Sequence, residues 1–187
     1  MAIPEARLIW PSLSNLEGWF FLSAALLLVS GGAKLADPAP TAGALRVAGI
    51  FSSNGAVYTL AVAEIATGVA SLIGGGSWGG WPLAALYGGF GIFVAVALRR
   101  RLPISSCGCF GKADTPPSIL HVLLNVAGVG GGVWAGLRSS PSLVSVLGDQ
   151  PLAGLLYLGF LAAGTYAAYL LLTALPVLLK PVVETYR

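Results

Sequence analysis

The only two cysteines of the chain, Cys107 and Cys109, stand one residue apart in the segment ISSCGCFGKAD, residues 104–114. A disulfide needs Cα atoms about 4.4–6.8 Å apart, so closing this short ring requires a tight turn, which Gly108 permits. Strained disulfides of this kind are labile and oxidising. The three arginines at 99–101 favour the thiolate, which is the reactive form. The pattern predicts a thiol pair that cycles between dithiol and disulfide.

Other uses of the two sulfurs remain open at this point. They could bind or transfer a soft ion such as Cu(I), which thiolates prefer. They could also be inert thiols that only hold a local turn. Structural zinc needs four ligands, and only His121 and Asp114 stand nearby, so no metal site is expected.

The composition indicates that most of the chain lies in lipid. Hydrophobic residues make up 56% of the 187 residues and charged residues only 9%, against about 25% charged in a soluble domain. The net charge of +3 does not indicate nucleic-acid binding, because the basic residues stand at the ends of apolar runs. We expect one membrane domain over residues 1–187, embedded in a lipid bilayer.

Five apolar runs are long enough to cross a bilayer, which takes roughly 20 residues. They lack the alternation of membrane strands, so an all-α integral membrane bundle is expected, with a four-helix core and one extra C-terminal span. The run near the N-terminus is interpreted as a retained span rather than a signal peptide, since no basic region precedes it. The predicted spans are 19–36, 56–73, 82–98, 118–137 and 151–175.

Four polar residues within or beside these spans are candidate site residues. Glu64 is the only carboxylate inside a predicted span, and a lone carboxylate in hydrocarbon costs a few kcal/mol, so it needs a partner or a proton. Lys34 is the nearest candidate partner. His121 could cap its helix or act as a base or donor near the thiols. Asn125, one turn further on, is expected to join helices by hydrogen bonding.

Glycines at four-residue spacing, Gly128, Gly132 and Gly136, form a one-sided seam in the fourth span. Small residues let membrane helices approach closely. The seam therefore predicts close helix contacts, within the chain or in an oligomer.

The motifs resemble the MauE/DoxX family of redox-associated membrane proteins. The similarity rests on four features: SGGAKLADP at the end of the first span, AEIATG in the second, CGCFG in the third loop, and an Asn in the following span. The resemblance covers roughly residues 20 to 137. It implies a helical bundle associated with thiol–disulfide chemistry, with Cys107 and Cys109 as the redox pair. Lys34, Glu64 and Asn125 match polar positions of the family.

The resemblance also implies partners and a function. MauE-type proteins are associated with maturation of methylamine dehydrogenase and often occur beside thioredoxin-like partners. The bundle is also similar to the vitamin K epoxide reductase type, which implies a quinone as candidate acceptor, although the CxxC of that type is missing here. We expect a membrane thiol–disulfide oxidoreductase or an accessory to one, acting in disulfide formation in exported proteins. A scaffold within a redox complex, and Cu(I) handling, are the alternatives.

The charge distribution predicts the orientation in the cytoplasmic membrane. Five spans leave only Arg7 and Arg138 on the side of the N-terminus. The opposite side carries the other eight basic residues: Lys34, Arg46, Arg99, Arg100, Arg101, Lys112, Lys180 and Arg187. Because Lys and Arg favour the cytoplasm, the cysteine loop and the C-terminus are expected inside and the N-terminus outside.

A reporter joined after Arg187 tests this orientation. A fluorescent protein should mature there, whereas alkaline phosphatase should stay inactive, because only the latter needs export. Active phosphatase at this position would reverse the assignment.

Overall fold

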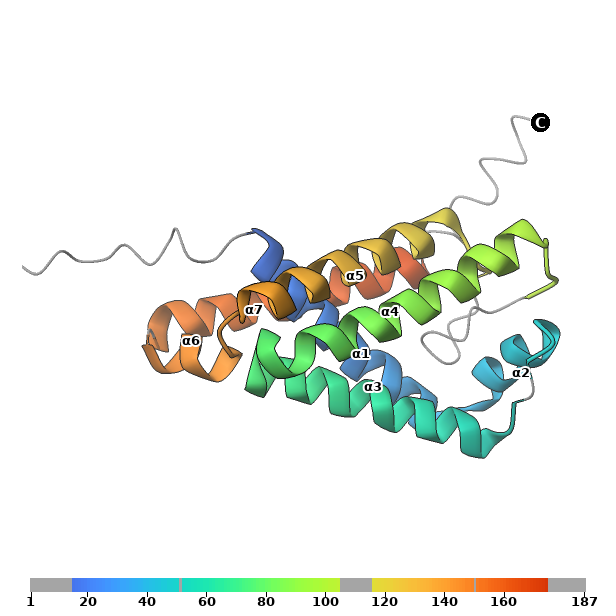
Figure 1. Ribbon diagram of the computed structural model, residues 1–187, viewed down its shortest axis with the longest axis horizontal. Coiled ribbons are helices and arrows are strands. Elements are labelled where there is room, and N and C mark those ends of the chain that lie inside the picture. The colour runs from blue at the N-terminus through green and yellow to red at the C-terminus, as the bar shows by residue number, and fades with distance from the viewer. Residues whose placement is uncertain (1–14, 51, 105–115, 150, 175–187) are drawn as a thin grey trace, which may run out of the picture.

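The protein is a bundle of antiparallel helices. The computed structural model describes residues 15–50, 52–104, 116–149 and 151–174, and no strand occurs among them. In chain order the helices are α1 (Asn15–Ala36), α2 (Ala39–Val47), α3 (Asn54–Gly74), α4 (Gly76–Arg99), α5 (Ile119–Arg138), α6 (Leu143–Asp149) and α7 (Pro151–Thr173). Successive long helices run in opposite directions along the bundle (Figure 1). The short helices α2 and α6 connect them at its two ends.

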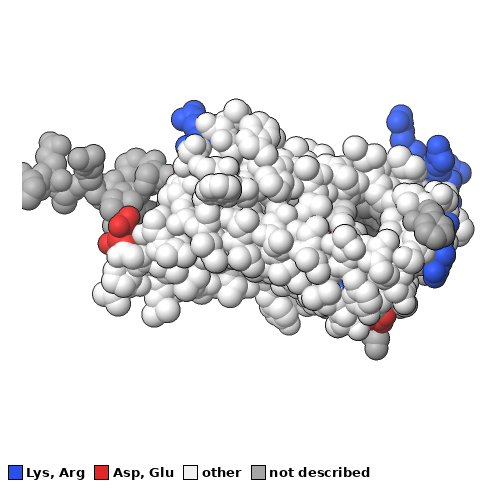
Figure 2. Space-filling model, turned by 60° about the horizontal axis from the view of Figure 1, so that its bottom comes forward, with Lys and Arg blue, Asp and Glu red and all other residues white. Residues whose placement is uncertain are grey.

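The expected number of five long apolar helices is confirmed. Helices α1, α3, α4, α5 and α7 are each long and apolar enough to cross a bilayer. Large apolar side chains point outward from them, among them Leu152, Phe160 and Trp78. Charged side chains lie only toward the ends of the face in Figure 2, which leaves an uncharged belt between them. The chain is therefore a multi-pass membrane protein.

Helix α1 lies at the centre and α7 at the edge of this bundle. Half of the apolar span of α1 is buried, against 11% for α7. Helix α7 packs against α1 and α6, while α4 and α5 form the most extensive helix pair. This arrangement agrees with the expected four-helix core and extra C-terminal span.

The start of α4 differs from the sequence prediction. The predicted spans leave residues 74–81 (GGGSWGGW) as a loop before a span beginning at Pro82, but the helix begins at Gly76 and Pro82 lies inside it. Gly75, with φ +68°, makes the whole turn from α3. The glycines at the start of α4 let its backbone pack directly against the backbone of α5. A Cβ on Gly80 would come within 2.6 Å of the Gly136 backbone nitrogen.

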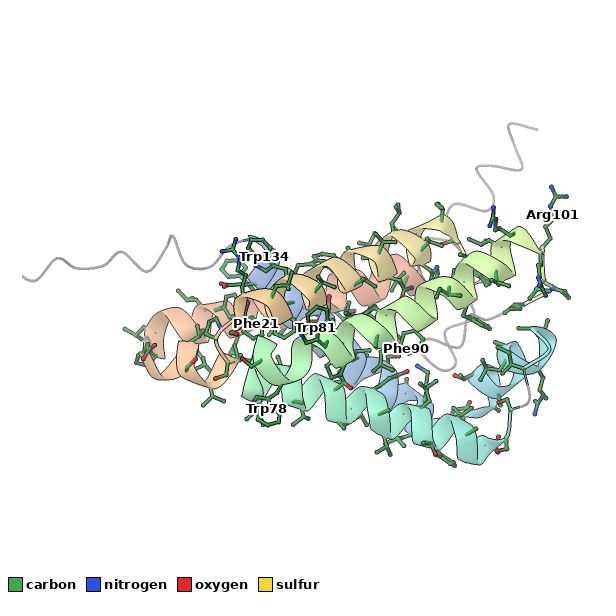
Figure 3. The ribbon with its side chains drawn as sticks, viewed as in Figure 1. Phe21, Trp78, Trp81, Phe90, Arg101 and Trp134 are labelled. Carbon is green, nitrogen blue, oxygen red and sulfur yellow. The ribbon has the colours of Figure 1, made fainter. Side chains whose placement is uncertain are left out.

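The glycine seam of α5 faces α4 in the same molecule. A Cβ on Gly132 would come within 2.7 Å of the carbonyl oxygen of Gly80, and one on Gly128 within 2.6 Å of the Tyr87 ring. A Cβ on Gly136 would meet the Trp81 indole at 2.9 Å. Trp81 is labelled in Figure 3. The seam thus holds two spans of one chain together.

Helices α1 and α3 approach equally closely. A Cβ on Gly31 would lie 2.8 Å from the Ala61 carbonyl oxygen and 2.7 Å from the Ile65 side chain. A Cβ on Gly68 would lie 2.9 Å from the Ala24 carbonyl oxygen. Backbone approach at two glycines, one on each helix, therefore sets the spacing of this pair.

Neighbouring glycines in the SGGAK segment provide a matched test of this contact. Gly31→Ala should lower the free energy of unfolding by about 1–3 kcal/mol, because its methyl group overpacks the interface with α3. Gly32→Ala places its methyl group in open space. It should be neutral or stabilise the protein by up to about 1 kcal/mol through the lower flexibility of alanine. Thermal unfolding in detergent compares the two, and equal midpoints would contradict the close approach.

Candidate functional site

A buried ion pair joins α1 to α3. Lys34 Nζ lies 2.9 Å from Glu64 Oε1 and donates a hydrogen bond of 3.0 Å to Oε2. Lys34 is 2% exposed and Glu64 is fully buried. The partnership expected from the lone carboxylate is therefore confirmed.

Two further groups surround the Lys34 ammonium. It donates a 2.6 Å hydrogen bond to Ser30 Oγ, one helical turn earlier on α1. The Phe90 ring of α4 lies 5.6 Å from Nζ, within the distance at which a cation attracts an aromatic face. Phe90 is labelled in Figure 3, on the part of α4 that faces α1 and α3. Three helices therefore contribute to the environment of one charge.

The location of the pair makes each partner depend on the other. Taking a charge out of water costs several kcal/mol, which the opposite charge and hydrogen bonds must offset. Glu64 lies ten residues beyond the start of α3, about 15 Å along its axis. At that depth a single unpaired charge would be strongly destabilising.

Close backbone contact brings the two side chains together. Gly31 stands one turn before Lys34, and a Cβ there would come within 3.2 Å of the Glu64 Cβ. A larger residue at this position would push α3 away and lengthen the ion pair. The glycine of the SGGAK segment is therefore part of the site, although it has no functional group.

The first two turns of α5 carry His121 and Asn125, both buried. The Nδ1 atom of His121 lies 2.8 Å from Ser118 Oγ, so this ring contacts the residue that precedes the helix. Asn125 Nδ2 donates a 2.7 Å hydrogen bond to the His121 carbonyl oxygen. This bond lies within one helix, so the interhelical bond expected for Asn125 is not the one formed.

A cavity of about 250 Å³ connects these groups. Its walls are mostly apolar and come from all five long helices and α2, and they include Lys34, Ser30, His121 and Asn125. A few polar groups converging in an apolar cavity are typical of ligand sites. Three of the four polar candidates thus line one space, and Glu64 is bonded to the Lys34 that lines it.

The two cysteines lie outside the described residues, which stop at Ile104 and resume at Pro116. The described flanks end at the same end of the bundle: α4 finishes at Arg99, and α5 begins there with Ile119. The side chain of Ile104 is buried against Ala44 and Ala97. Arg101, labelled in Figure 3, lies at this end and is exposed.

Sequence reasoning missed Ser30, Phe90 and Tyr87. Tyr87 donates a 2.8 Å hydrogen bond to the Ser23 carbonyl oxygen and so links α4 to α1. Ser30 could have been found, since it stands four residues before Lys34 on the same helix face. The sequence does not single out Phe90 or Tyr87 in this way. Their partners are on another helix, and the position of a residue along one helix does not show which other helix it contacts.

A double-mutant cycle tests the ion pair. Lys34→Met or Glu64→Gln alone should lower the free energy of unfolding by about 3–5 kcal/mol, because each leaves a buried partner without its counterpart. The double variant should recover much of the loss. Unfolding in mixed micelles measures all four proteins, and additive losses would contradict the coupling.

Comparison with known proteins agrees with this architecture. The model of the family of the methylamine utilisation protein MauE matches residues 16–138, from the start of α1 to the end of α5. No curated protein and no solved structure matches the chain. The matched region contains the ion pair, His121 and Asn125, and it leaves out α6 and α7. Family membership suggests a membrane protein involved in maturation of methylamine dehydrogenase. The chain belongs to the MauE family.

Proposed function

We propose that this MauE-family protein exchanges electrons with a thioredoxin-like partner through Cys107 and Cys109. The observation that carries the proposal is the position of the pair in the chain: the only two cysteines stand one residue apart between α4 and α5. The described flanks of that connection lie at one end of the bundle (Figure 1), and Lys34 in the last turn of α1 and His121 in the first turn of α5 belong to the same end. Thiols attached there could serve a partner in the aqueous phase and a protein embedded in lipid.

The exchange takes two substitutions at sulfur. The thiolate of one cysteine attacks the partner disulfide, forming a mixed disulfide and releasing one partner thiolate. The second cysteine then attacks the mixed disulfide, which closes the Cys107–Cys109 ring and releases the second partner thiolate. The pair loses two electrons and the partner gains two. The reverse sequence would oxidise a partner. Because the charge bias places the pair at the cytoplasmic end, disulfide formation in an exported protein would also need electrons to be relayed across the membrane.

The charges around the pair support thiolate chemistry. Arg99, Arg100 and Arg101 directly precede the connection and are exposed. Neighbouring cations stabilise a thiolate and so increase the attacking fraction. At the other end of the bundle, Arg138 is the one Lys or Arg among the described residues. We infer that this asymmetry both orients the protein and prepares its thiols, with the basic end at the cytoplasm.

Alkylation mass spectrometry tests the cycle. Wild-type protein should gain two alkyl groups in reducing buffer and none in mildly oxidising buffer, because the disulfide blocks both thiols. The single variants Cys107→Ser and Cys109→Ser should keep one reactive thiol under both conditions. One of them should trap a mixed disulfide with the partner.

The double variant Cys107→Ser, Cys109→Ser is the control and separates the alternatives. Loss of partner oxidation with normal membrane insertion would support exchange. Equal alkylation of the wild type in both buffers, together with normal partner oxidation in the double variant, would instead identify a scaffold.

A further inference from the structure

The cavity beside the ion pair is long and follows the axis of α1. Five of its lining residues share one face of this helix: Trp19, Ser23, Leu27, Ser30 and Lys34. From the first to the last is fifteen residues, about 22 Å of helix. Helices α1 and α4 touch little along this length, whereas α1 packs closely on α3 and α4 on α5. The cavity therefore fills the space between two well-packed helix pairs.

Its polar groups gather toward one end. Lys34, Thr41 and His121 lie near the basic end of the bundle, and Asn125 lies one turn deeper. The deeper walls are mostly apolar and include Leu27, the aromatic residues Tyr87 and Phe90, and Leu124, with Ser23 as a polar exception. A molecule matching this distribution has a polar head and a hydrocarbon body.

The charges of the site select an uncharged head. Lys34 and Glu64 neutralise each other at 2.9 Å, so a carboxylate or an ammonium group entering the cavity would meet no compensating net charge. Neutral partners are available. His121 uses Nδ1 with Ser118, which leaves Nε2 for a ligand, and Asn125 donates from Nδ2, which leaves its carbonyl oxygen as an acceptor. A ligand hydroxyl can donate to the Asn125 oxygen, and a ligand hydroxyl or carbonyl can accept from His121 Nε2 in the tautomer that carries its proton there.

The cavity reaches the surface in the apolar part of α4. Gly89 lines it and is exposed, and a Cβ added there would have no neighbour within 4 Å. Gly89 stands ten residues before Arg99, about 15 Å from the end of α4 and near the middle of a bilayer. Figure 2 shows a hollow in the uncharged face, toward the end where Lys and Arg gather. An opening at this depth faces the hydrocarbon phase.

We propose that this cavity is a binding site for an uncharged amphiphile from the bilayer, its hydroxyl or carbonyl head at His121 and Asn125 and its hydrocarbon body along α1 and α4. A volume of about 250 Å³ is close to the lower end of the usual range for ligand pockets. The occupant is therefore a small amphiphile. The proposal does not depend on the thiol chemistry, because none of its groups is a cysteine.

Photolabelling of the full chain in phosphatidylcholine nanodiscs tests the site. The probe is decanol carrying a diazirine near the end of its chain, compared with the same chain ending in a carboxylate or a trimethylammonium group. The alcohol should label peptides of α1 and α4 saturably and about tenfold more strongly than either ion, equivalent to about 1.4 kcal/mol. Excess unlabelled decanol should displace it.

Two glycines in open space provide matched variants. Gly89→Leu places its side chain at the opening and should reduce labelling about tenfold. Gly130→Leu makes the same change on α5, at a position that does not line this cavity and where a Cβ also meets nothing within 4 Å. It should label as the wild type does. Thermal unfolding confirms that both variants are folded.

Asn125→Leu tests the recognition of the head. It should abolish the preference for decanol over a decane probe of the same length while leaving decane labelling unchanged. The proposal would be overturned by equal labelling with alcohol and ions, by equal effects of the two glycine variants, or by labelling of the wild type that unlabelled decanol does not displace. The last of these results needs no variant and stands even if a variant does not fold.

Discussion

The close approach of α1 and α3 is the constraint on which the rest of the structure depends. Two glycines, Gly31 and Gly68, remove the side chains that would keep the backbones apart. The reduced spacing lets Lys34 reach Glu64 deep in the bundle. An ion pair in that position is costly to form and much more costly to break, so it selects one helix register. The same glycine contact that packs the helices thus also determines where the charges meet.

A second glycine contact has a different consequence. The seam between α4 and α5 draws these helices together as tightly as α1 and α3, through Gly80 and Gly132. Because each of these helices packs closely on another partner, α1 and α4 contact each other little. Tyr87 of α4 donates a hydrogen bond across to the Ser23 carbonyl oxygen of α1. The space that remains becomes the cavity. Tight packing in two places therefore creates an opening in a third.

The basic end of the bundle unites the two proposals without making either depend on the other. The chain between α4 and α5 carries the cysteines, and the described flanks of that segment lie where the polar head of a cavity ligand would lie. Exposed arginines at the end of α4 favour thiolate, whereas the neutral ion pair inside favours uncharged ligands. One end of a membrane bundle can thus offer an ionic environment outside and a neutral one within.

The sequence by itself determined the spans, the class of fold and the pairing of Lys34 with Glu64. The length of an apolar run can be compared directly with the thickness of a bilayer. A lone carboxylate in lipid requires a counter-charge. It did not reveal that α4 begins at Gly76, because a glycine-rich segment resembles a loop until its neighbours are known. It also predicted an interhelical hydrogen bond for Asn125, whereas its side-chain nitrogen donates to a carbonyl oxygen of its own helix. Only the tertiary structure decided the cavity. Its size depends on how closely helices that are far apart in sequence approach each other, and hydropathy does not encode that distance.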